Sequence, residues 1–112
     1  MSEIHDYDKD YNRILEVIRE SDISDSNKQA MFGFKDHLLS EGIKYARIIK
    51  YLYVLKKFNG LFKKAFESAT EADIRRIIGE INQTRLKEST KRDFRLTLRR
   101  FYVYLRGYKR KE

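Results

Sequence analysis

The residues with the clearest chemical potential lie on one predicted helix near the C-terminus, which begins at Ser89 or Thr90 and ends before Gly107. At about 100° per residue, several cations share one sector of this helix at a pitch of roughly one turn. Cations at this pitch can meet successive phosphates or reach guanine edges in a DNA major groove. The two hydroxyls and the free backbone N–H groups at the helix start suit a phosphate. The candidate DNA-binding residues of this helix are Ser89, Thr90, Lys91, Arg92, Arg95, Arg99 and Arg106.

An amphipathic helix with a merely solvated outer face is the alternative interpretation. Such a helix usually carries acids that pair with its cations at i,i+4 spacing, and only Asp93 interrupts this stretch. A second predicted helix, over residues 44–58, carries a weaker version of the same pattern. Long cationic side chains often cover apolar surface, so the structural alternative has more weight here. Its candidate DNA-binding residues are Lys44, Tyr45, Arg47, Lys50 and Lys57.

Catalytic and metal-binding patterns are missing from the sequence. The chain has no cysteine, which excludes disulfides, thiolate metal sites and cysteine nucleophiles. His5 and His37 are the only histidines, and no pair of ligands has zinc-site spacing. His37 precedes the core residue Leu38 and is expected to be a half-buried surface histidine. The sequence therefore predicts a binding protein without catalytic residues, metal or cofactor.

Charge is distributed unevenly along the chain. Residues 1–42 hold ten acids and five bases, a net of −5, whereas residues 43–112 hold seven acids and twenty bases, a net of +13. A positive potential focused on part of the surface favours a polyanionic partner. The first twenty residues lack an apolar signal segment, and no apolar run could span a membrane. We expect a cytoplasmic protein with no membrane partner.

The elements that position these residues are predicted to be helices, because apolar residues recur at helical spacing almost throughout. The predicted helices cover residues 8–21, 26–40, 44–58, 71–82 and 89–106, and the third either ends near Gly60 or continues towards Lys64. Ser24 or Ser26 can cap the second helix, Gly42 suits its exit, and Thr70 with Asp73 forms a capping box. The expected fold class is all-α, a compact bundle of four to five helices.

The order of several motifs resembles the N-terminal core-binding domain of tyrosine recombinases, the phage-integrase family, and most closely its archaeal members. Arg47-x-x-x-Tyr51-x-x-x-Leu55-x-x-Phe58 is followed by Ala69-Thr70-x-x-Asp73-Ile74, then Ser89-Thr90, then Leu98-Arg99-Arg100-Phe101-Tyr102-x-Tyr104-Leu105. The resemblance covers roughly residues 24–106. Many bacterial members have threonine at the position of Arg47, so the phosphate contact there departs from that pattern.

The resemblance implies a SAM-like bundle that clamps one side of double-stranded DNA during integration and recombination. A separate C-terminal catalytic domain of the same protein would clamp the other side, and other recombinase protomers would share the DNA. The catalytic residues would belong to that domain, so no tyrosine of this chain is expected to be catalytic. The implied organisation is an N-terminal helical extension over 1–23, the core-binding domain over 24–106, and the start of a linker over 107–112.

Two other interpretations stay open on the sequence. The chain could be a stand-alone helical DNA-binding regulator or accessory factor, or a bundle whose basic face meets an acidic protein or RNA. The recombinase interpretation expects the open reading frame to continue past Glu112 into a catalytic domain.

Overall fold

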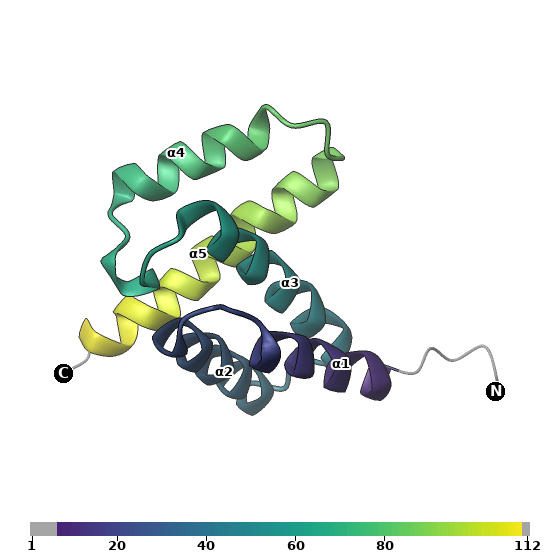
Figure 1. Ribbon diagram of the computed structural model, residues 1–112. Helices are drawn as coiled ribbons and strands as arrows, with labels where there is room; N and C mark the ends of the chain where they lie inside the picture. The colour runs from purple at the N-terminus through teal and green to yellow at the C-terminus, as the bar shows by residue number, and fades with distance from the viewer. Residues whose placement is uncertain (1–6, 111–112) are drawn as a thin grey trace.

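The computed structural model describes residues 7–110, with side chains placed for residues 7–107. Within this range the chain forms five α-helices and one 3-10 helix, and no β-strand. They are α1 (Tyr7–Glu20), α2 (Asp25–Ser40), α3 (Tyr45–Phe62), η1 (Phe66–Ser68), α4 (Glu71–Asn82) and α5 (Glu88–Arg110) (Figure 1). The predicted all-α bundle is confirmed, whereas His5 lies outside the described residues.

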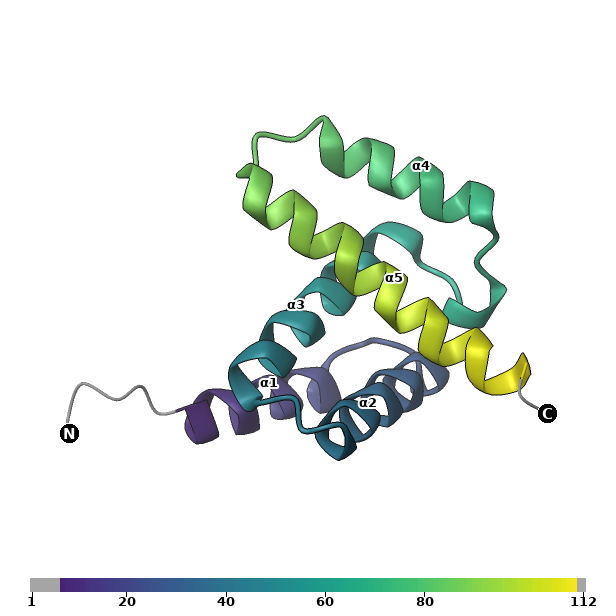
Figure 2. The same ribbon diagram turned by 180° about the vertical axis from the view of Figure 1, so that it is seen from behind.

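The helices divide the molecule into two ends. α1 and α2 lie together at one end, and α4 with the first turns of α5 lies at the other (Figure 1). Seen from behind, α5 runs diagonally across the molecule with α4 above it and α3 below it (Figure 2). The acidic N-terminal sequence therefore builds one end of the fold, and the basic C-terminal sequence builds most of the other.

Local signals fix both ends of α2 and the start of α4. The Ser24 hydroxyl accepts a hydrogen bond from the Asn27 backbone N–H and so caps α2. At the other end of α2, Gly42 has a φ of 84°, and the Ile43 N–H reaches back to the Leu38 carbonyl at 3.0 Å. This is the Schellman arrangement that glycine favours because it has no Cβ. The predicted capping box at the start of α4 is also present.

Two helices continue past glycines at which the sequence pattern predicted a possible helix end. α3 runs through Gly60 to Phe62 and ends at Lys63, which adopts a left-handed φ of 65°. The prediction that the last helix ends before Gly107 is wrong, because α5 continues to Arg110. Glycine costs a helix only about 1 kcal/mol relative to alanine, and burial of Phe62 on α3 outweighs that cost. Residues 111 and 112 of the expected linker lie outside the described residues.

A single apolar core joins all five helices. The apolar stripes of α2 and α3 are buried throughout, and on α5 Phe94, Leu98 and Phe101 are buried while Leu105 is half-buried. Phe101 lies at its centre, with its ring 5.2 Å from that of Phe34 and 5.4 Å from that of Phe66. α5 therefore has one side committed to packing and must present any ligand-binding residues on the others. The buried stripes are Met31, Phe34 and Leu38 on α2, and Ile48, Tyr51, Leu52, Leu55 and Phe58 on α3.

Candidate nucleic-acid interface

Among the described side chains of α5, Arg92 and Arg99 are the exposed cations that make no hydrogen bond or ion pair with the rest of the fold. Both side chains face solvent, and neither takes part in a hydrogen bond or an ion pair within the described part of the chain. They lie on the edge of α5 that faces α4. An arginine in this state can donate to a phosphate or a base edge without first breaking an internal contact.

Lys91 and Arg95 share that side of α5 but are committed to α4. Lys91 is only 8% exposed, and its ammonium donates to the Asn82 carbonyl at 3.0 Å and to Glu88 at 3.3 Å. Arg95 is half-buried and donates to the Asn82 side-chain oxygen at 3.2 Å. Both cations thus satisfy groups at the C-terminal end of α4, where the helix dipole favours positive charge. The expectation that Lys91 belongs to a row of ligand-facing cations is corrected: α4 packs over it.

Arg106 is also engaged within the fold. Its guanidinium donates to the Ala69 carbonyl and stands 4.7 Å above the Tyr102 ring. The Tyr102 hydroxyl donates in turn to the Phe66 carbonyl at 2.8 Å. Burial raises the pKa of Tyr102 far above that of a free tyrosine, so this hydroxyl remains a donor at neutral pH. Arg106 and Tyr102 together anchor the segment that leads into α4. Arg106 therefore has a structural role that the sequence pattern did not reveal.

A groove of about 390 Å³ separates α4 from α5, and we call it the α4–α5 groove. Its floor is apolar, from Ile74 and Ile78 on α4 and from Leu98 and Tyr102 on α5. Three of the arginines of α5 stand along it. The full lining is Ile74, Ile78, Arg92, Arg95, Leu96, Leu98, Arg99 and Tyr102.

The candidate residues of α3 also divide into exposed cations without an internal partner and a residue that packs within the fold. Arg47, Lys50 and Lys57 are exposed and make no ion pair within the described residues. Tyr45 stacks on Tyr11 with ring centroids 4.0 Å apart, so it holds α1 against α3. Lys44 is the exposed residue that precedes α3, and its side chain makes no cap hydrogen bond.

A second groove brings α3 and α5 candidates together, and we call it the α3–α5 groove. It encloses about 280 Å³ and includes Lys50, Lys57 and Thr90. Ser89 and Thr90 are exposed in the first turn of α5, which begins at Glu88, one or two residues earlier than predicted. The complete lining is Ile49, Lys50, Tyr53, Val54, Lys57, Leu86, Thr90, Asp93 and Phe94.

Sequence reasoning missed two exposed cations, Arg85 and Lys87, in the loop over 83–87 that joins α4 to α5. Their neighbour Leu86 lines the α3–α5 groove, so this loop connects the cations of α3 with those of α5. The sequence signal for these two cations is their position in a polar loop, directly before the start of a helix. We use the name basic surface for the exposed cations Arg47, Lys50, Lys57, Arg85, Lys87, Arg92 and Arg99.

Arg100 projects from a different side of α5 than Arg99, about 100° further around the helix. It donates to the Tyr51 hydroxyl at 3.4 Å and to Glu41 at 3.3 Å, so it links α5 with α3 and with the end of α2. His37 is half-buried as expected, with its Nε2 atom 3.3 Å from Glu41. Among the residues that the structure describes, no group of three or more His, Cys, Asp or Glu side chains could hold a metal ion. Likewise, none of the helices in the described range has the length and apolar character needed to cross a membrane.

Comparison with known proteins gives no match. None of the protein-family models, curated proteins or solved structures that were compared resembles the chain closely enough to be matched to it.

Proposed function

We propose that this protein binds double-stranded DNA through the basic surface of α3, α5 and the loop that joins α4 to α5. The observation that carries the proposal is the set of exposed cations on this surface that pair with no acid of the described chain. Residues 43–112 carry a net charge of +13, whereas residues 1–42, which include α1 and α2, carry a net charge of −5. A protein stabilised by surface ion pairs would distribute the two signs together, whereas a polyanion-binding surface keeps its cations free.

The geometry suits a duplex better than a small anion. α5 extends over 23 residues, and its edge that faces α4 carries the exposed Arg92 and Arg99, which are about two turns apart. A DNA major groove admits one α-helix, and arginine is the side chain that most often contacts guanine there. The lysines of α3 and the loop cations would then contact the flanking phosphates and fix the position of α5.

As a more specific proposal, the domain acts as the core-binding domain of a tyrosine-type site-specific recombinase. The ordered motifs of α3, α4 and α5 support it, since they resemble that family. In this role the bundle grips one side of the duplex, a C-terminal catalytic domain of the same protein grips the other, and further protomers assemble on the DNA. The chain contributes orientation and affinity, and the catalytic domain carries the strand exchange.

The first test is the salt dependence of binding to a short labelled duplex, followed by fluorescence anisotropy. Each phosphate contact releases counterions, so the logarithm of the affinity should fall by about one unit per logarithmic unit of salt for each contact. Alone, the domain should bind a random duplex with micromolar or weaker affinity near physiological salt. Affinity that does not change with salt would contradict the electrostatic basis of the proposal.

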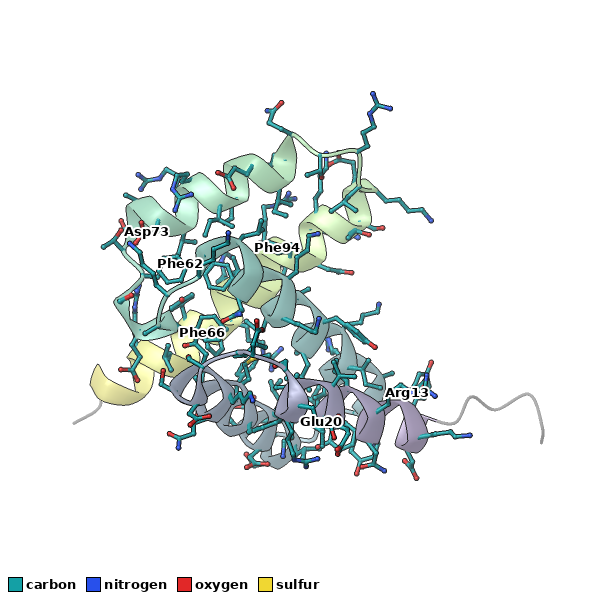
Figure 3. The ribbon with its side chains drawn as sticks, viewed as in Figure 1. Arg13, Glu20, Phe62, Phe66, Asp73 and Phe94 are labelled. Carbon is teal, nitrogen blue, oxygen red and sulfur yellow. The ribbon has the colours of Figure 1, made fainter. Side chains whose placement is uncertain are left out.

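The second test compares two exposed arginines on different ends of the fold. Arg99→Ala removes an unengaged cation of the basic surface and should weaken binding, with a salt slope lower by about one if its contact is a phosphate. Arg13→Ala makes the same change on α1, far from α4, and should leave binding unchanged (Figure 3). Arg95 and Arg100 are poorer probes because their removal breaks contacts with Asn82 and with Glu41. Equal effects of the two substitutions would contradict the proposed orientation.

A further inference from the structure

The α3–α5 groove differs from the rest of the basic surface because it is apolar inside and polar only at its edge. Buried Phe94 and the half-buried Ile49 and Val54 form its interior. Two side chains that would ordinarily be buried are exposed there: Tyr53 is 52% exposed and Leu86 is 36% exposed. Contacts to phosphate alone need no such interior, so a ligand with an apolar, flat part fits this groove better than an anion does.

The polar groups at the edge of the α3–α5 groove are free to contact a ligand. Lys50 and Lys57 from α3, the Tyr53 hydroxyl, and Thr90 and Asp93 from α5 make no side-chain hydrogen bond or ion pair within the described residues. Asp93 in particular is only half-exposed and still lies outside ion-pair distance of both lysines. The α4–α5 groove is different, because Arg95 at its edge is already bonded to Asn82.

We infer that the α3–α5 groove holds one unpaired nucleotide of a bound nucleic acid, with its base against Tyr53 and its phosphates near Lys50 and Lys57. This inference rests on the proposed DNA binding and adds a site to it. Stacking on an exposed aromatic ring is how proteins hold unpaired bases, and cations along the strand donate hydrogen bonds to the phosphate oxygens. A carboxylate accepts hydrogen bonds from the exocyclic amino group of cytosine or adenine, so Asp93 favours these bases over thymine. The volume of about 280 Å³ is at the lower limit of small-ligand pockets, roughly 300–1,000 Å³, which suits one base.

The test uses the full chain and two labelled duplexes that differ by a single unpaired adenine. The bulged duplex should bind more tightly than the fully paired one by roughly fivefold or more, the lower end of what base–aromatic stacking contributes. Tyr53→Ala should abolish this difference while affinity for the paired duplex stays within about twofold, and Tyr53→Phe should preserve it because the ring remains. Replacing the bulged adenine by thymine should weaken binding to the natural chain but not to Asp93→Asn. Circular dichroism would verify that each variant folds.

The outcomes separate this inference from the proposed function. A bulge preference that survives Tyr53→Ala would place the unpaired base elsewhere and overturn the inference. Equal binding of both duplexes would also overturn it, leaving the groove to another occupant such as an apolar side chain of a protein, while salt-dependent duplex binding would still support the proposed function. Weaker binding to both duplexes in Arg99→Ala, with unchanged binding to the paired duplex in Tyr53→Ala, would support the separation of Arg99 from the base-binding site.

Discussion

At the scale of single residues, the sequence predicts apolar burial well and polar burial poorly. Asn27 shows why. It is 3% exposed, its amide donates to Asn59 and to the Lys64 carbonyl, and its carbonyl oxygen accepts from the Phe66 N–H. All three partners lie more than thirty residues further along the chain. Asn27 could not be identified as a core residue without knowing where α3 ends, just as Lys91 could not be identified as buried without the position of α4.

The capping box of α4 is a residue-scale feature with a pH-dependent consequence. The Thr70 backbone N–H donates to the Asp73 carboxylate at 3.0 Å, and this hydrogen bond lowers the pKa of Asp73 below that of a free aspartate. A lowered pKa means that the carboxylate stabilises the fold fully above the unfolded value of about 3.9 and that this contribution is lost as the pH falls through the folded value.

Asp73→Asn should therefore flatten the dependence of the unfolding free energy on pH below about pH 4. Urea denaturation at several pH values between neutrality and pH 3 measures it. Glu71→Gln in the same helical turn is the control, since Glu71 accepts no backbone N–H within the described residues and pairs only with exposed Arg75. A steeper acid dependence in Asp73→Asn than in the natural chain would contradict the assignment.

At the scale of elements, four of the five predicted helix starts lie within one residue of the observed ones, and the fifth is one or two residues off. The reason is that spacing and caps are local: Ser24, Thr70 and the apolar stripes carry their signal within a few residues. Helix ends are less predictable where tertiary packing determines the last residue of the helix. Lys63 ends α3 only because Phe62 must reach the core before the chain turns towards η1.

Lys63 is the one described residue other than glycine with a left-handed φ, and the strain there can be relieved. Glycine adopts this conformation without a Cβ clash, so Lys63→Gly should raise the free energy of unfolding by about 0.5–1 kcal/mol. Lys64→Gly is the matched control, because the neighbouring exposed lysine does not have a left-handed φ and should gain nothing. Urea denaturation of both variants gives the comparison. A gain from Lys64→Gly that equals the gain from Lys63→Gly would mean that the turn is not strained.

At the scale of the whole molecule, α1 is part of the same core as the other helices. The sequence pattern placed residues 1–23 outside the recombinase-like region, as an extension. In the structure, Tyr11, Ile14, Leu15 and Ile18 all lie in the core, and Tyr11 stacks on Tyr45 of α3. α1 also covers one side of α3, which restricts the exposed cations of α3 to the sides that remain. The packing of α1 on this core could not be predicted from the sequence, because an amphipathic pattern shows that a helix packs but not on which partner.

If α1 belongs to the core, disturbing its buried face should destabilise the whole domain rather than one helix. Ile14 is fully buried, so Ile14→Ala should lower the free energy of unfolding by about 2–5 kcal/mol, a large share of the roughly 5–15 kcal/mol that domains of this kind possess. Val17→Ala, on the same helix at a residue that is 40% exposed, should change it by about 0.5 kcal/mol or little more. Thermal melts followed by circular dichroism, and by near-ultraviolet absorption of the core tyrosines on α3 and α5, should move together in Ile14→Ala. A separate early transition confined to α1 would show instead that the first helix is an appendage, and the basic surface could then fold and bind without it.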